Sequence, residues 1–78
     1  MVEIRLINVD RNIAYFHCLP EFKENEAFDL EIDLEKEEIR SCSASAKLNV
    51  YVAHAVWKIY DLFETTGNIP ERTSSVWV

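Results

Sequence analysis

The sequence predicts an α+β fold, in which an antiparallel sheet of three to four strands carries one long amphipathic helix on one face. Apolar residues alternate or run together through the first half of the chain, and they recur with a helical period through most of the second half. Short charged turns separate the expected strands, and antiparallel pairing of successive strands needs only such short connections. At 78 residues, we expect a single domain spanning 1–78.

The first two expected strands form a β-hairpin. Residues 2–9 begin with alternating apolar and charged side chains, and residues 13–22 begin with an almost continuous apolar run, which is typical of an inner strand. Between them, Asp10-Arg11-Asn12 has turn composition, and Asn12 suits the left-handed conformation at the end of a three-residue loop.

A three-residue loop fixes the expected register of this hairpin. Val9 then faces Ile13, Leu6 faces Phe16 and Ile4 faces Cys18. The opposite face of the sheet, away from the helix, would carry an apolar patch formed by Ile7, Val9, Ile13, Tyr15 and Leu19.

The next strand is the most regular. Residues 28–35 place Phe28, Leu30, Ile32 and Leu34 inward and four acids outward. Residues 39–43 are a candidate fourth strand, although their composition is polar.

The second half of the chain predicts one helix over residues 45–66, capped by Ser43 or Ser45. Its apolar stripe runs from Leu48 to Phe63, and Gly67 with Pro70 ends it. In the tail 68–78, we expect the last six residues either to add an edge strand or to lie across the helix.

The helix carries apolar residues on its expected solvent side as well. Val50, Ala53 and Trp57 lie there at i, i+3 and i+7, and Tyr60 flanks them. The C-terminal tail would cover Trp57 through Val76 or Trp77, or the surface binds another molecule. The leading hypothesis is therefore a non-enzymatic protein–protein interaction or assembly module, forming a homodimer through these residues or through Ile13 and Tyr15 on the sheet.

Acidic residues are concentrated in one segment. Residues 21–38 contain nine acids and two bases, a net charge of −7, and the remainder has a net charge of +1, which gives −6 for the chain. This balance disfavours direct nucleic-acid binding. The alternative hypothesis is an acidic inhibitor or nucleic-acid mimic that docks on a basic protein through Asp29, Glu31, Asp33 and Glu35, and the competing interpretation is a solvated strand face.

An enzyme is the third and least favoured hypothesis. Cys42 and His54 form the only candidate nucleophile–base pair, and helical phasing turns His54 away from the sheet. A zinc site from Cys18, Cys42, His17 and His54 lacks the usual paired spacing, and His17 and Cys18 should point to opposite faces of their strand. The sequence thus indicates no cofactor and no metal.

Two cysteines and the absence of a leader-like segment predict reduced thiols and a cytoplasmic location. No apolar run is long enough to predict a membrane span.

Overall fold

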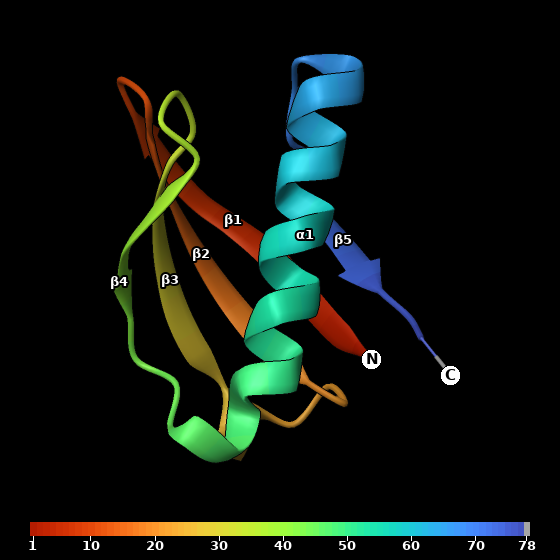
Figure 1. Ribbon diagram of the computed structural model, residues 1–78. Coiled ribbons are helices and arrows are strands. Elements are labelled where there is room, and N and C mark those ends of the chain that lie inside the picture. The colour runs from red at the N-terminus through yellow and green to blue at the C-terminus, as the bar shows by residue number, and fades with distance from the viewer. Residues whose placement is uncertain (78) are drawn as a thin grey trace.

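The computed structural model describes residues 1–77, so Val78 at the end of the predicted tail lies outside the described residues. In the described residues, a meander of four strands is followed by one α-helix and by a fifth strand that returns to the sheet, and Figure 1 shows this arrangement. The strands are β1 (Val2–Asp10), β2 (Ile13–Pro20), β3 (Phe28–Asp33), β4 (Glu38–Cys42) and β5 (Arg72–Ser75), and the helix is α1 (Asn49–Thr66). The fold is α+β, and the predicted count of three to four strands is too low because β5 adds another.

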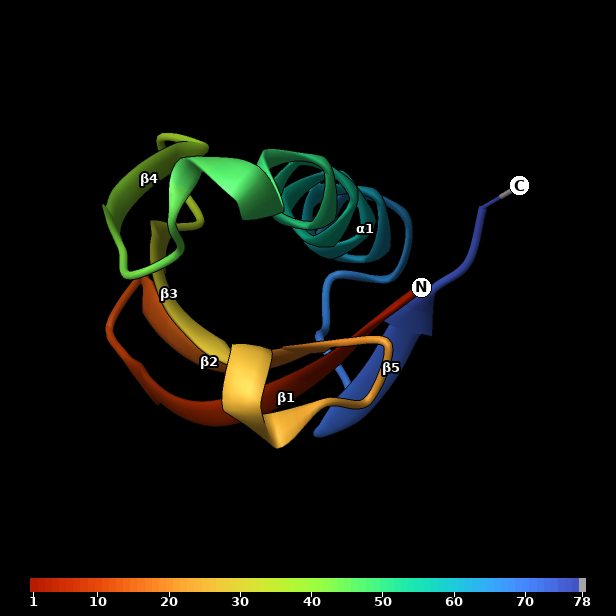
Figure 2. The same cartoon turned by 90° about the horizontal axis from the view of Figure 1, so that it is seen from below.

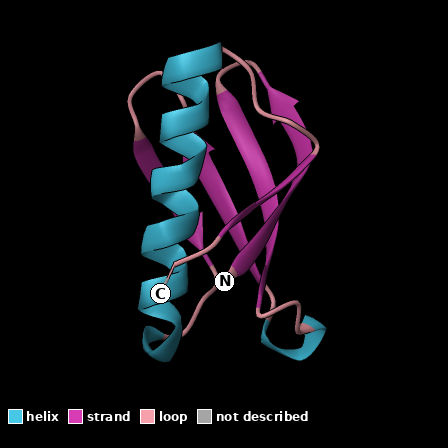
Figure 3. Cartoon of the chain, turned by 90° about the vertical axis from the view of Figure 1, so that its right-hand side faces the viewer, coloured by secondary structure: helices cyan, strands magenta, loops and turns pink. Residues whose placement is uncertain are grey.

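The described strands form one antiparallel sheet in the order β4-β3-β2-β1-β5. The first and last strands of the chain are therefore neighbours. The sheet curves, and Figure 2 shows α1 lying in its concave side. Figure 3 shows the same arrangement from the side, with the helix crossing in front of the strands.

The core lies between the concave face of the sheet and the helix. Ala55 and Ile59 of α1 are fully buried in the same cluster as the inward side chains of the strands. The strand residues of this core are Val2, Ile4, Ala14, Phe16, Cys18, Phe28, Leu30 and Ile32.

The β1–β2 hairpin differs from the predicted register beyond Leu6. Leu6 faces Phe16 and Ile4 faces Cys18, as expected, but the loop contains two residues, Arg11 and Asn12, and Val9 faces Ala14 instead of Ile13. A bulge between Leu6 and Asn8 absorbs the difference. The left-handed residue of the loop is Arg11, with φ 60°, and not Asn12.

β2 ends two residues before the predicted end. Glu21 and Phe22 have φ of 50° and 61°, and the Lys23 amide donates to the carbonyl of Pro20 at 2.9 Å. These angles belong to a tight turn rather than a strand. A short 3₁₀ turn, η1 (Glu24–Glu26), follows before β3.

β3 is also shorter than the predicted 28–35. Leu34 and Glu35 lie in the turn that leads to β4, although Leu34 stays buried and its amide donates to the Asn12 carbonyl at 2.8 Å.

The helix begins later than predicted. The 3₁₀ turn η2 (Ala46–Leu48) precedes α1. No serine side chain caps the N-terminus of η2 or the N-terminus of α1. The Ser43 hydroxyl instead accepts the Asp29 amide at 2.8 Å, which links the start of the helical segment to β3. Gly67 ends α1 as predicted, with φ 75° and its amide donating to the Phe63 carbonyl.

Candidate interaction surface

The outward face of α1 carries the apolar residues that the helical phase predicts there. Val50 and Trp57 are 57% and 62% exposed, and Ala53 between them is also exposed. Tyr60, the fourth residue predicted for this surface, is half-buried and packs against the core cluster. The exposed apolar stripe of the helix therefore consists of Val50, Ala53 and Trp57.

The C-terminal tail reaches this helix because β5 pairs with β1. The buried carboxylate of Glu3 in β1 holds Arg72 of β5 at 3.1 Å and Arg5 at 3.3 Å. After β5, the chain passes the helix, and the Trp77 indole stacks on the His54 imidazole with ring centroids 3.8 Å apart. Tyr51 meets the same indole edge-on at 5.5 Å.

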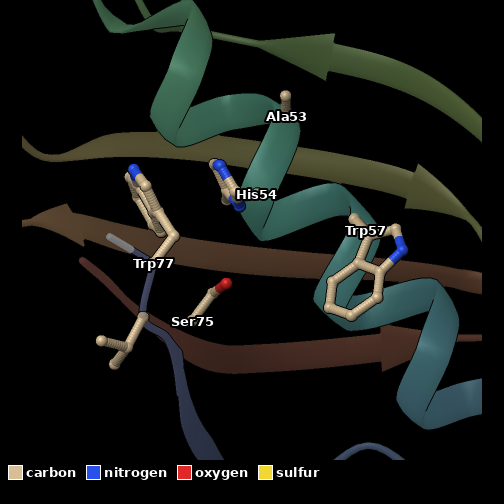
Figure 4. A pocket seen from close by; sticks show the side chains of 6 residues that line it. Ala53, His54, Trp57, Ser75 and Trp77 are labelled. Carbon is tan, nitrogen blue, oxygen red and sulfur yellow. The ribbon is translucent and has the colours of Figure 1, made fainter.

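Neither residue expected to cover Trp57 does so. Trp77 lies on His54 and Tyr51, and Val76 is itself 67% exposed. An open groove of about 560 Å³ remains between the helix and the tail. Figure 4 shows Trp57 on one side of this groove and the stacked His54 and Trp77 on the other.

We refer to this groove as the helix–tail groove. Its described lining consists of Ala53, His54, Trp57, Ser75, Val76 and Trp77. None of these is Asp, Glu, Lys or Arg, although the chain contains 22 such residues, 14 of them acidic. The groove is thus an uncharged, aromatic region of an acidic protein.

The apolar patch predicted on the convex face of the sheet is smaller than expected. The bulge places Val9 opposite buried Ala14, on the helix side, and Leu19 is buried. Ile13 and Tyr15 are half-buried, which leaves Ile7 as the most exposed member at 64%. A hollow beside Ile7 and Tyr15 also contains acidic and hydroxyl side chains, so this face is mixed in character.

The acids of the predicted acidic surface make contacts within the chain, although Asp29 and Glu35 stay exposed to solvent. Asp29 accepts from His17 Nδ1 at 2.9 Å, and Glu24 lies 2.8 Å from His17 Nε2 on the other side of the ring. These two carboxylates hold the pKa of His17 above its ordinary value.

The other three acids of this surface have partners as well. Glu31 pairs with Arg40 at 3.5 Å, and Glu35 accepts from the Asn12 amide at 2.7 Å. Asp33 accepts the backbone amide of Lys36 at 3.0 Å in the turn after β3. Each of the four carboxylates therefore has a structural role in the sheet or its turns.

The candidate catalytic and zinc-binding residues are not gathered at one place. Cys42 lies in β4, at the opposite edge of the sheet from β5, whereas His54 stacks on Trp77 beyond β5. Cys18 is fully buried, and burial raises its pKa to about 12. Within residues 1–77, no cluster of three or more potential metal ligands occurs.

Sequence reasoning placed Trp57 on this surface but not the pairing of His54 with Trp77. That pair depends on β5, and the sequence left open whether the tail adds an edge strand, as β5 does, or lies across the helix. The sequence feature that could have indicated this pair is Trp77, an aromatic residue near the end of the tail.

No protein-family model matches this chain, and neither a curated protein nor a solved structure is significantly similar to it. None of the helices in residues 1–77 has the length and apolar character that a membrane crossing requires.

Proposed function

We propose that this protein is a non-enzymatic interaction module that forms a homodimer through the helix–tail groove and the apolar helix stripe beside it. The observation that carries this proposal is the exposure of Trp57 on a helix whose stripe continues through Ala53 to Val50. Large aromatic side chains are enriched at the anchoring points of protein interfaces.

Burial of this surface would supply a substantial driving force. Covering one exposed tryptophan contributes about 2–4 kcal/mol before the entropy of association is subtracted. A chain of 78 residues also has a thin core, and a second copy would add to the buried apolar area.

The charge distribution favours self-association at this place. Two copies that each carry a net charge of −6 repel one another at most surfaces. The helix–tail groove has an uncharged lining, so two such grooves meet without bringing like charges into direct contact.

Light scattering after size exclusion, over a wide range of protein concentration, tests the homodimer. We expect a dimer whose dissociation constant rises about 10- to 30-fold in Trp57→Ala, with an unchanged far-UV circular dichroism spectrum. The matched control is Ile39→Ala, which removes an exposed apolar side chain from β4, at the other edge of the sheet. The proposal would be overturned if the protein were a monomer at every concentration, or if both substitutions raised the dissociation constant of the dimer equally.

The sheet residues Ile13 and Tyr15 are a second possible anchoring surface for the same function. Both are half-buried in the monomer, so they have less area to contribute than Trp57. Tyr15→Ala in the same experiment separates the two surfaces.

An acidic inhibitor or nucleic-acid mimic is the weaker candidate function. Its surface would be Asp29, Glu31, Asp33 and Glu35, and the contacts of these carboxylates with His17, Arg40, Asn12 and the Lys36 amide reduce their availability to a partner. Salt-sensitive capture of a basic protein, abolished by charge reversal at Asp29, Glu31 and Asp33, would favour it. For either function we propose a reducing, cytoplasmic setting, in keeping with two free cysteines.

A further inference from the structure

One edge of β5 is open in the sheet of the described residues. β5 is the last strand of the sheet and pairs on one side only, with residues Val2 to Arg5 of β1. Beyond that pairing, the Leu6 amide donates to the Glu71 carbonyl at 2.9 Å, so residue 71 directs its backbone toward β1.

Backbone direction alternates along a strand. Since residue 71 points toward β1, Thr73 and Ser75 point there too, opposite Ile4 and Val2. Arg72 and Ser74 then direct their amide and carbonyl groups away from the sheet. These outward groups are the hydrogen-bonding positions that an additional strand would use.

The same edge leads into the helix–tail groove. Ser75, the last residue of β5, and Val76 after it both line the groove, with Trp57 on the facing helix. A strand that pairs with β5 would therefore lie close to the exposed side chains of Trp57 and Val76. Backbone bonding along β5 and apolar contact in the groove would act together.

We propose that the two copies join through antiparallel pairing of β5 with β5, which extends the sheet continuously across the dimer. This inference rests on the homodimer proposed above and specifies its interface. A two-fold axis at Ser74 pairs that residue with Ser74 of the partner subunit and pairs Arg72 with Val76 of the partner subunit. Arg72 and Ser74 direct their backbone outward within β5, and extending the same alternation by one residue gives Val76 the same direction, so β5 is complementary to itself in this register.

The other edge of the sheet is less suited to this role. β4 contains Glu38 and Arg40, and its pairing with β3 is interrupted by a bulge. Charged residues and bulges on an edge strand oppose pairing with a further strand. β5 has one charged residue, Arg72, and its side chain is already held by Glu3.

Site-specific cross-linking tests this geometry in the full chain. In a Cys42→Ser background, Ser74→Cys places a thiol at the proposed axis, and Ser41→Cys places one on β4 as the control. Cys18 is buried and does not compete. With a short bismaleimide, we expect the covalent dimer to form at least ten times faster from Ser74→Cys than from Ser41→Cys. The reason is that the Cα atoms of a hydrogen-bonded antiparallel pair lie about 5.5 Å apart.

A backbone substitution gives an independent test. Ser74→Pro removes an outward amide and leaves the bonds to β1 in place, whereas Ser74→Ala keeps the amide. We expect dimerisation to be at least tenfold weaker for the proline variant than for the alanine variant, both with native circular dichroism spectra.

The outcomes separate the two proposals. A dimer that loses affinity in Trp57→Ala but cross-links equally from both cysteine positions, or is unaffected by Ser74→Pro, overturns β5 pairing and leaves the proposed function standing. A monomer at all concentrations overturns the homodimer itself and the pairing with it.

Discussion

The indole of Trp77 lies flat against the imidazole of His54, with ring centroids 3.8 Å apart and planes 2° from parallel. This stack fixes the C-terminal tail on α1 and sets one side of the helix–tail groove. Val76 and Trp77 thereby lie beside Trp57 without covering it. The groove therefore depends on an aromatic contact between two segments that are distant in sequence.

Removal of the indole should release the tail. We expect Trp77→Ala to lower the free energy of unfolding by about 1–2 kcal/mol, the range for loss of an aromatic pair and its buried area. Ring-current shifts of the His54 protons, measured by NMR, should disappear in this variant. Val76→Ala, at the adjacent exposed position, should keep both the shifts and the stability, and retention of the shifts in Trp77→Ala would contradict the stack.

Two residues of the helix provide a matched test of the core and the surface. Trp57 is 62% exposed, whereas Ile59, two residues later, is fully buried between helix and sheet. In urea unfolding of the monomer at low concentration, Ile59→Ala should cost about 2–5 kcal/mol and Trp57→Ala about 0.5 kcal/mol or less. Similar costs for both would mean that Trp57 is structural, which would weaken its assignment to an interface.

Side-chain periodicity predicted the regular parts of the fold. Alternation located the first and third strands, a continuous apolar run located the second, and the period of 3.6 located α1, whose Ala55 and Ile59 are buried, because packing dictates all of these patterns. The same phase argument placed Trp57 on the exposed side of the helix.

Local backbone irregularities were not predictable from composition. The bulge near Ile7 could not be predicted, because Ile7 and Val9 fit the regular alternation of a strand. The bulge nevertheless moves Val9 to the helix side of the sheet. Left-handed conformations at Arg11, Glu21 and Phe22 occur without glycine, so composition predicted the first turn but assigned its left-handed residue to Asn12, and it did not indicate the turn at Glu21 and Phe22. The sequence left two positions open for the tail, at the sheet edge or across the helix, because the four residues of β5 have no periodic pattern; pairing with β1 and the ion pair between Arg72 and Glu3 hold them at the edge.

The two cysteines should react very differently. Cys42 is exposed, whereas burial of Cys18 raises its pKa to about 12 and leaves almost no thiolate at neutral pH. We expect a maleimide to modify one thiol per native chain, identified as Cys42 by mass spectrometry, and a second only after unfolding. Cys42→Ser should be unreactive in the native state, and rapid native modification of Cys18 would contradict its burial.

His17 makes the stability of the folded protein depend on pH. In the folded state Asp29 and Glu24 raise the pKa of its imidazole above the ordinary value, so folded protein binds this proton more tightly than unfolded protein. The resulting stabilisation is fully present below the unfolded pKa of about 6.5 and is lost as the pH rises through the folded pKa. His17→Gln should remove this contribution.

Urea unfolding of wild type and His17→Gln at a series of pH values from 5 to 9 measures the difference directly. We expect wild type to be the more stable protein at the acidic end, with the gap closing as the pH rises. NMR titration of the His17 ring should give a raised pKa in wild type that falls toward the ordinary value in Asp29→Asn, because the hydrogen bond that His17 donates to Asp29 is the largest cause of the shift. A gap that stays constant with pH would mean that protonation of His17 does not contribute to stability.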